Sequence, residues 1–323
     1  MSSEGFTVSG ISVPKSRFEV SVQVPKVPEI MATPPHQPVA TSQPNTLGVP
    51  AKQPYIISES NKAFLEAVDS ISATGRNTNI LVTGKQGIGK SELVVQYAAT
   101  RNRPLATLEI GNLAEASQIF GRMDLKDGAT TYVPGLFTEA ITTPNAVVHL
   151  QEINRPENDK ALNAIFSVLD DTYRAIWIDE LQKTLKVAPG VTFFASLNEG
   201  FEFIGTLPLD EALRNRFQIK LDLTPLPRAQ ERIVLLMKAQ LTEEQVEILL
   251  DLADRLRGNT QEPIYLSTRD LVNIALLMQH GLSPTMAVKG VVGTGMDKLE
   301  SVLLSEHLAG RGFIQEEEKY GIL

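Results

Sequence analysis

Cysteine is absent from this chain, and its absence excludes several kinds of site. Without thiols there is no disulfide framework, no thiol nucleophile and no cysteine–zinc site. The sequence also contains no apolar run near the ~18 residues of a membrane span, and no basic-then-apolar leader. A reducing compartment suits such a chain, so we expect a cytoplasmic protein that does not enter the membrane.

Aromatic residues are few, at 6% of the chain, and acidic residues outnumber basic ones, giving a net charge of −8 at pH 7. A broad basic surface and a stripe of alternating aromatic and basic residues are both missing, which argues against a dedicated nucleic-acid protein. Only four histidines occur, so His149, inside an apolar run, is expected to be a core residue and not a metal ligand.

The strongest positive signal is the pattern G-x-x-x-x-G-K-S between Gly84 and Ser91. An apolar run directly before it predicts a buried strand, and apolar residues at helical spacing follow it. In that context the glycines let backbone N–H groups curl around phosphate oxygens, and the helix dipole adds positive potential. A glycine-rich turn that binds nothing is the alternative. The predicted nucleotide-binding residues are Gly84, Lys85, Gln86, Gly87, Ile88, Gly89, Lys90, Ser91 and Glu92.

A second apolar strand is predicted from Ala146, and it ends in Gln151 and Glu152. After a P-loop this is the Walker B position, where an Asp-Glu pair usually holds the Mg²⁺ shell and polarises the attacking water. We expect Glu152 to be catalytic, and Ser91 with Gln151 to serve the metal. Gln151 lacks the usual charge, which Asp124, Asp127 or Asp210 would restore if the fold brought one of them near.

Two further polar positions are candidate site residues. Asn198 stands at the tip of a predicted strand beside Walker B, where an amide can orient water or contact the γ-phosphate. Arg269 falls in the first turn of a predicted helix, an unfavourable place for a cation unless a phosphate faces it. The alternative is a surface arginine paired with Asp270.

Composition divides the chain into three parts. Residues 1–50 hold eight of the nineteen prolines and predict an extended arm, with one strand pattern at 18–24 that adds to a sheet edge or else stays disordered. Residues 51–226 alternate strand and helix patterns, and residues 227–323 are helical. Within the α/β part, 111–135 is expected to be a long, weakly structured functional insertion, 180–186 a polar turn, and Trp177 a packing residue.

The order of these motifs resembles that of the AAA+ ATPases. Their residues resemble those of the MoxR-like, dynein-related branch, which includes chelatase small subunits. The resemblance covers about residues 55–290 and implies a P-loop core with a parallel sheet flanked by helices, plus a small C-terminal α-helical lid. It also implies sensor roles for Asn198 and Arg269, and an arginine finger at Arg216 or, second, Arg214. The pieces that carry it are 135–140, 152–155, 198–200, 205–209, 212–217 and 267–269.

The resemblance further implies a homo-oligomeric ring, a hexamer, with ATP and Mg²⁺ bound between subunits. Hydrolysis would remodel a partner protein, in this branch often one with a von Willebrand-type domain. Two other classes stay open: a structural nucleotide-binding ring with little hydrolysis, which Gln151 favours, and a nucleic-acid-associated motor, which the acidic charge disfavours. A GTPase is disfavoured because no N-K-x-D motif occurs.

Overall fold

The structure is a computed structural model of the whole chain, and it describes residues 40–41, 47–112, 119–126, 128–154, 165–197, 211–258 and 266–292. The part described contains no helix with the length and apolar character needed to cross a membrane. Several predictions lie outside these residues: the strand at 18–24, Asp127, Asn198 and Asp210, together with all or part of the pieces at 152–155, 198–200 and 205–209.

Five parallel strands form the central sheet, in the order β10-β2-β9-β6-β3. Their inner strands are buried on both faces, which is why the sequence shows continuous apolar runs there and not alternation. This confirms the predicted α/β class with a parallel sheet. The strands are β2 (Thr78–Thr83), β3 (Leu105–Glu109), β6 (Val147–Gln151), β9 (Thr192–Ser196) and β10 (Ile219–Asp222).

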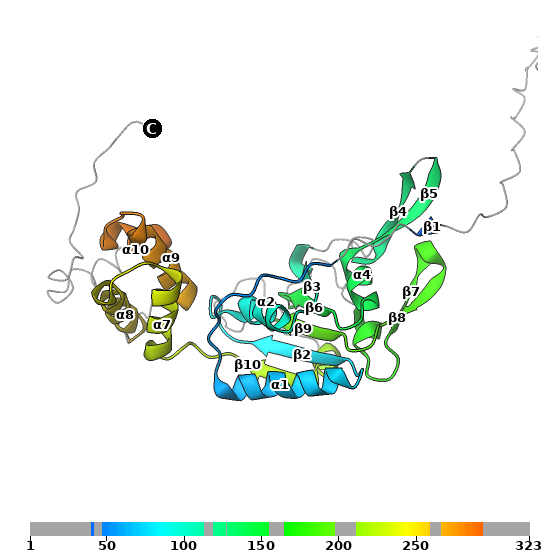
Figure 1. Cartoon of the computed structure of the whole chain (residues 1–323), viewed down its shortest axis with the longest axis horizontal. Coiled ribbons are helices and arrows are strands. Elements are labelled where there is room, and N and C mark those ends of the chain that lie inside the picture. The colour runs from blue at the N-terminus through cyan, green and yellow to red at the C-terminus, as the bar shows by residue number, and fades with distance from the viewer. Residues whose placement is uncertain are drawn as a thin grey trace, which may run out of the picture. The chain divides into compact units, whose positions relative to one another are not determined.

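Helices α1 (Glu59–Ala73) and α2 (Lys90–Thr100) pack against one face of this sheet (Figure 1). Alternate residues of β2 separate the two faces. Ile80 and Val82 join the cluster under α1 and α2, whereas Leu81 joins the cluster on the opposite face. α1 and α2 therefore cover the face of the sheet that carries Ile80 and Val82, as expected for a sheet flanked by helices.

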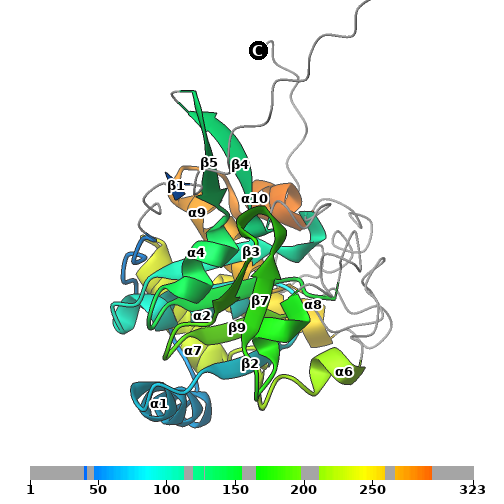
Figure 2. The same cartoon turned by 90° about the vertical axis from the view of Figure 1, so that its right-hand side faces the viewer.

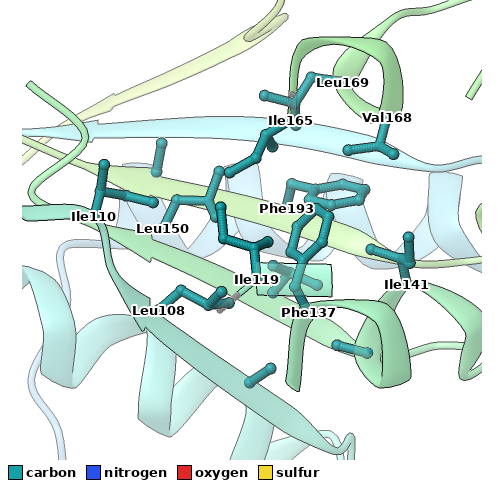
Figure 3. Packing of buried hydrophobic residues seen from close by; sticks show 14 of the residues in the cluster. Leu108, Ile110, Ile119, Phe137, Ile141, Leu150, Ile165, Val168, Leu169 and Phe193 are labelled. Carbon is teal, nitrogen blue, oxygen red and sulfur yellow. The ribbon is translucent and has the colours of Figure 1, made fainter. Parts of the chain in front are cut away.

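The opposite face is covered by α4 (Leu136–Thr142) and by a 3₁₀ turn at Phe166–Leu169. Figure 3 shows Phe137 and Ile141 of α4 packed against Phe193 of β9, with Ile165 and Leu169 from the segment around the turn. This large apolar cluster extends to Leu213 and Phe217, on either side of the C-terminal end of α6 (Glu211–Arg214).

Antiparallel pairing occurs at two places where the sequence predicted irregular structure, the insertion at 111–135 and the polar turn at 180–186 (Figure 2). β4 (Gly121–Lys126) pairs with β5 (Ala129–Pro134) inside the supposed insertion, and β1 (Ala40–Thr41) adds to β5 in parallel. β7 (Ala175–Ile178) pairs with β8 (Lys183–Lys186) where a polar turn was expected. Short 3₁₀ turns occur at Ile110–Asn112 and Asp179–Leu181. Both predictions were wrong because strands with mostly solvent-facing side chains lack the apolar alternation that reveals a half-buried strand.

Trp177 corrects a third expectation. Its side chain is 51% exposed on β7, and its indole Nε1–H donates to Asp179 Oδ1 at 2.8 Å. The neighbouring Ile176 and Ile178 are buried instead. Because one face of this hairpin is covered and the other is open, strand alternation places Trp177 on the open side.

The C-terminal part is helical and has its own apolar cluster. Arg228 of its first helix forms ion pairs with Glu247, Asp251 and Asp254 of the second. The helices predicted for this part are present where the structure describes it. They are α7 (Arg228–Lys238), α8 (Glu243–Gly258), α9 (Thr268–Gln279) and α10 (Pro284–Val292).

Candidate active site

The glycine-rich loop between β2 and α2 begins at Gly84, and its backbone there permits only glycine. The φ angle of Gly84 is +138°, and an added Cβ would lie 2.4 Å from Ile88 Cδ1 and 2.5 Å from the Leu223 carbonyl oxygen. Both the torsion and the space therefore exclude a side chain. The loop curls tightly from the end of β2 into the first turn of α2, which begins at Lys90.

Gly87 brings the loop into contact with the start of α9. An added Cβ at this position would lie 2.2 Å from Ser267 Oγ, and the Arg269 N–H donates to the Gly87 carbonyl at 3.3 Å. The missing side chain thus allows the helical part of the chain to approach the loop at backbone distance.

Lys90 lies inside the curve of the loop and is only 8% exposed. Its ammonium group donates to the carbonyl oxygens of Gly84 at 2.8 Å and Lys85 at 2.7 Å. A largely buried ammonium needs acceptors, and the loop carbonyls supply them. The ammonium group is therefore held inside the curve of the loop, where an anionic oxygen would find a cation already in place.

The end of β6 carries the Walker B residues, and its backbone is unusual. Gln151 is the last residue of the strand, and Glu152 follows with a φ of +52°, which is uncommon for a residue with a side chain. The next N–H, of Ile153, donates to the Ser196 carbonyl at the end of β9, at 3.1 Å. That hydrogen bond ties the turn to the neighbouring strand and supports the left-handed conformation of Glu152.

One cavity of about 60 Å³ joins these features. It contains the P-loop, both Walker B residues and Arg269, so the structure brings together predicted residues from three separate segments. Asp124, on β4, does not line it. Asn198 lies outside the described residues, although its predecessor Leu197 is part of the lining. The lining residues are Gln86, Gly87, Gly89, Lys90, Ser91, Gln151, Glu152, Ser196, Leu197 and Arg269.

A second cavity, of about 290 Å³, shares Gly87, Gly89, Ser91 and Arg269 with the first. Its other walls are largely apolar and come from three distant segments, so no local pattern in the sequence pointed to them. Tyr55 covers the loop here, and its hydroxyl donates to the Gly89 carbonyl at 3.2 Å. The residues that sequence reasoning missed are Pro54, Tyr55, Ile56, Leu226, Val234, Met237, Lys238, Thr268 and Val272.

Arg269 begins α9 as expected, but its alternative partner is otherwise engaged. The Asp270 carboxylate accepts from the N–H of Ser267 at 2.9 Å and from its hydroxyl at 2.6 Å, and Ser267 Oγ accepts from the Asp270 N–H. This capping box stabilises the first turn. Across the described residues no ion pair joins Arg269 to Asp270, and the Arg269 side chain lines both cavities.

Arg214 and Arg216 do not reach either cavity. The Arg216 carbonyl accepts a hydrogen bond from Asn79, near the start of β2, whereas the P-loop follows the end of that strand. Five residues of strand separate the two by roughly 16 Å. The structure thus places Arg216 at the opposite edge of the sheet from the P-loop of its own chain.

His149 is fully buried in β6, as expected, and its Nε2 lies 3.0 Å from Ser196 Oγ. Burial lowers the pKa of His149 to about 4, so the imidazole is neutral at physiological pH. The described residues hold no cluster of three or more His, Cys, Asp or Glu side chains that could bind a metal ion. A cation in the smaller cavity would meet the Ser91 hydroxyl, the Gln151 amide and the Glu152 carboxylate, which all line it.

Comparison with known families divides the chain in the same way as the fold. Residues 79–217 match the family described as "AAA domain (dynein-related subfamily)", and residues 231–295 match "CbbQ/NirQ/NorQ C-terminal". The first match runs from the second residue of β2 to Phe217, two residues before β10, and the second spans most of the helical part. The two matched segments therefore contribute opposite walls of the cavities.

Two relatives have most of their length in common with this chain. A protein named putative chaperone BssE, from Thauera aromatica, is 45% identical over 265 residues, which cover 82% of this chain and 91% of that protein. Protein NorQ from Paracoccus denitrificans is 28% identical over 223 residues, which cover 68% of this chain and 81% of that protein. Both alignments are long enough to include residues on both sides of the cavities.

The buried imidazole of His149 predicts a specific pH dependence of stability. Its pKa is about 4 when folded and about 6.5 when unfolded. Between these values the unfolded chain binds more protons, so the free energy of unfolding falls as pH is lowered through this window. We expect a loss of about 2 kcal/mol between pH 7.5 and pH 5 from this group alone.

Urea unfolding of the nucleotide-free protein at both pH values measures the effect. His149→Asn should remove that share of the pH dependence. His280 is exposed, so His280→Asn is the matched control and should retain the wild-type pH dependence. Equal pH dependence in all three proteins would contradict the assignment.

Proposed function

Because the chain belongs to the dynein-related, MoxR-like branch of the AAA+ ATPases, we propose that it binds ATP with Mg²⁺ between subunits of a ring and uses hydrolysis to remodel or activate a partner protein. The observation that carries this proposal is the small cavity where Lys90, Ser91, Gln151, Glu152 and Arg269 meet. It combines a cation for phosphates, a hydroxyl for a metal and a carboxylate for water in one place.

The residues present fit a nucleoside triphosphate. The curled loop and the first turn of α2 offer N–H groups to phosphate oxygens, and Lys90 adds the charge. The larger, mostly apolar cavity adjoins this point and suits a base, with Tyr55 and Met237 among its walls. Mg²⁺ would be held by the Ser91 hydroxyl and through Gln151, together with waters and phosphate oxygens.

Each polar residue then has a separate task. Glu152 accepts a hydrogen bond from the attacking water and orients it, which its turn position at the end of β6 favours. Arg269 faces the phosphates from the helical part and stabilises charge as it moves toward the leaving group. Asn198, which follows Leu197 of the cavity wall, is the residue we assign to contact the γ-phosphate or its water.

The arginine finger is proposed to act in trans. Arg216 lies at the far edge of the sheet from its own P-loop, so it can reach phosphates only on another chain. A closed ring gives every subunit the same neighbour on each side and so completes every site. A hexamer is the ring size that the family resemblance implies. Hydrolysis would then depend on assembly.

The target is proposed to be a protein, possessing a von Willebrand-type domain as in other members of the branch. The relative named as a putative chaperone supports work on another protein, and it aligns over 82% of this chain. A second candidate function has one observation in its favour. Gln151 lines the cavity where an aspartate is usual, which favours a ring that binds ATP for assembly and hydrolyses it slowly.

Replacing Lys90 tests nucleotide binding. Lys90→Ala removes the cation at the centre of the loop, and we expect affinity for ATP to fall by about 2 kcal/mol, or roughly thirtyfold. Titration with a fluorescent ATP analogue measures it. Lys62 is an exposed lysine of α1 that lines neither cavity, and Lys62→Ala is the matched control that should bind nearly as wild type. Equal affinities for wild type and Lys90→Ala would refute the proposed site.

Replacing Gln151 tests whether the neutral amide at this position slows hydrolysis. An aspartate would hold a Mg²⁺-bound water more strongly than a neutral amide, and its oxygen lies one methylene closer to the chain. Gln151→Asp should therefore raise the rate, or lower the Mg²⁺ needed for half of it, by roughly tenfold. Phosphate release against Mg²⁺ concentration is the measurement.

Gln151→Asn is the control, since it shortens the side chain without adding charge. A gain with aspartate alone attributes the effect to charge, and a gain with both attributes it to geometry. If neither changes the rate or the Mg²⁺ requirement, Gln151 is compensated elsewhere and the slow-ring candidate is dropped.

Mixing variants tests the shared site. Arg216→Ala should bind ATP nearly as wild type but lose hydrolysis. The substitution leaves the P-loop of its own subunit intact and removes the guanidinium charge only from the site of the neighbouring subunit. An equal mixture with Lys90→Ala should recover activity at about a quarter of the interfaces, where an intact P-loop meets an intact finger. Exchange of subunits is checked with two affinity tags. Exchange without recovery would contradict action in trans.

A further inference from the structure

Asn79 is a buried polar residue with no place in the mechanism so far. It is the second residue of β2, is 0% exposed, and lines neither nucleotide cavity. Its side chain lies on the sheet face of Leu81, not on the α2 face. Burying an amide costs free energy unless its hydrogen bonds are satisfied, so the partners of Asn79 identify what it holds.

All hydrogen-bonding groups of the Asn79 side chain are used. Its amide nitrogen donates to the carbonyl oxygens of Leu169 at 2.8 Å and Arg216 at 2.6 Å, and its Oδ1 accepts from Arg174 Nη1 at 2.7 Å. An asparagine has two N–H donors and one carbonyl. The Asn79 backbone N–H donates as well, to Gln218 Oε1 at 3.1 Å.

These partners surround the segment that carries Arg216. Leu169 ends the 3₁₀ turn that packs in the apolar cluster of Figure 3. The turn's Phe166 lies under the Arg216 guanidinium, 5.0 Å from ring centroid to guanidinium carbon. One amide group of Asn79 therefore bonds both the Arg216 backbone and the 3₁₀ turn against which the Arg216 side chain rests.

The orientation of Arg216 depends on its hydrogen bond from Asn79, because its other hydrogen bonds lie within its own turn. The Arg216 Nη1 donates to the Ala212 carbonyl at 2.8 Å, and its N–H donates to Leu213 at 3.1 Å, both within its own turn. Phe217, 2% exposed, anchors the next residue in the core. The contact that reaches the Arg216 carbonyl from the sheet is Asn79 Nδ2, which fixes the peptide plane between Arg216 and Phe217.

We propose that Asn79 is a positioning residue for Arg216: it sets the finger that a subunit presents to its neighbour, and it leaves the nucleotide site of its own subunit unaffected. The inference rests on the proposed trans role of Arg216. Asn79 lies in the strand that leads into the P-loop, so its position in the sequence alone would assign it to the nucleotide site of its own subunit.

Two substitutions test this proposal. Asn79→Leu removes all three side-chain hydrogen bonds with little change of shape, and Asn79→Asp removes the two donors while keeping an acceptor beside Arg174. Thr78→Val is the matched control: Thr78 is the preceding buried residue of β2, and its hydroxyl bonds to Thr192, not to the Arg216 segment.

For the Asn79 variants we expect affinity for a fluorescent ATP analogue within about twofold of wild type and hydrolysis reduced at least tenfold. Thr78→Val should keep both close to wild type. A similar loss in Thr78→Val would mean that the strand as a whole was weakened and would overturn the proposal. So would failure of both Asn79 variants to fold, as judged by thermal unfolding.

Mixed rings provide the readout that a general structural role would not change. An Asn79 variant mixed with Lys90→Ala should recover as much hydrolysis as Arg216→Ala mixed with Lys90→Ala, because the Lys90 variant supplies an intact finger. Mixed with Arg216→Ala it should recover none, because both fingers are then defective. The reverse pattern, or recovery with neither, would overturn the assignment to Arg216.

The reference mixture keeps the two claims apart. If Arg216→Ala and Lys90→Ala restore hydrolysis together but the Asn79 variants do not follow the expected pattern, the shared site stands and the role of Asn79 is refuted. If the reference mixture fails although subunits exchange, the shared site itself is refuted, and the inference about Asn79 fails with it.

Discussion

The order of the five parallel strands is the constraint on which the candidate site depends. With β2 between β10 and β9, and β9 between β2 and β6, the carboxyl ends of three neighbouring strands meet at one edge. The P-loop, the Ser196–Leu197 wall and the Gln151–Glu152 pair come from those ends. Parallel strands place ligand sites at this edge because loops and helix N-termini converge there. The same order sends Asn79 and Arg216 to the opposite edge.

Backbone geometry then decides how closely these segments approach. Gly84 and Gly87 remove side chains at points where Leu223 and Ser267 would collide with them. Glu152 keeps its side chain despite a left-handed backbone, and the adjacent Ile153 N–H bonds to Ser196. A strained conformation persists only where neighbours over-determine it. The strand β9 therefore supports the backbone turn at Glu152, and the imidazole of His149 lies within hydrogen-bonding distance of the Ser196 hydroxyl.

How much the sequence predicts depends on whether a feature is local. The strand, loop and helix around Lys90 were predictable because buried parallel strands are continuous apolar runs and the loop motif has fixed spacing. Glu152 followed from its place at the end of the next such run. The hairpins were not predictable, since exposed strands such as β8 read as polar turns. The role of Tyr55 in the larger cavity was also hidden, because its neighbours there come from residues 226–238 and 268–272.

Asn79 illustrates a further limit. A single polar residue before an apolar run predicts a strand boundary and nothing more. Its structural role is apparent only from its hydrogen bonds to Leu169, Arg174 and Arg216. Partners 90 to 137 residues away leave no trace in local periodicity. Buried polar networks are specified by tertiary contacts, so sequence patterns detect the core that surrounds them and not the network itself.

The helical part is rigid where it meets the site. Glu231, 1% exposed in α7, accepts from both terminal nitrogens of Arg257 at 2.8 and 3.0 Å and from the Thr268 hydroxyl at 2.6 Å. Breaking such a buried pair costs about 3–5 kcal/mol, because it leaves an unpaired charge in the interior. The start of α9, and Arg269 with it, is thereby tied to α7 and α8 and moves with them.

The hydrogen bonds that cross from the helical part to the α/β part are longer and more exposed than the hydrogen bonds of Glu231. The Arg269 N–H reaches the Gly87 carbonyl at 3.3 Å, and Lys238 Nζ reaches Gln53 Oε1 at 3.1 Å on the surface. Neutral or exposed hydrogen bonds of this kind each contribute about 1 kcal/mol. A ligand whose phosphates contacted both the P-loop and Arg269 would therefore add interactions across this boundary and stabilise the arrangement in which the two meet.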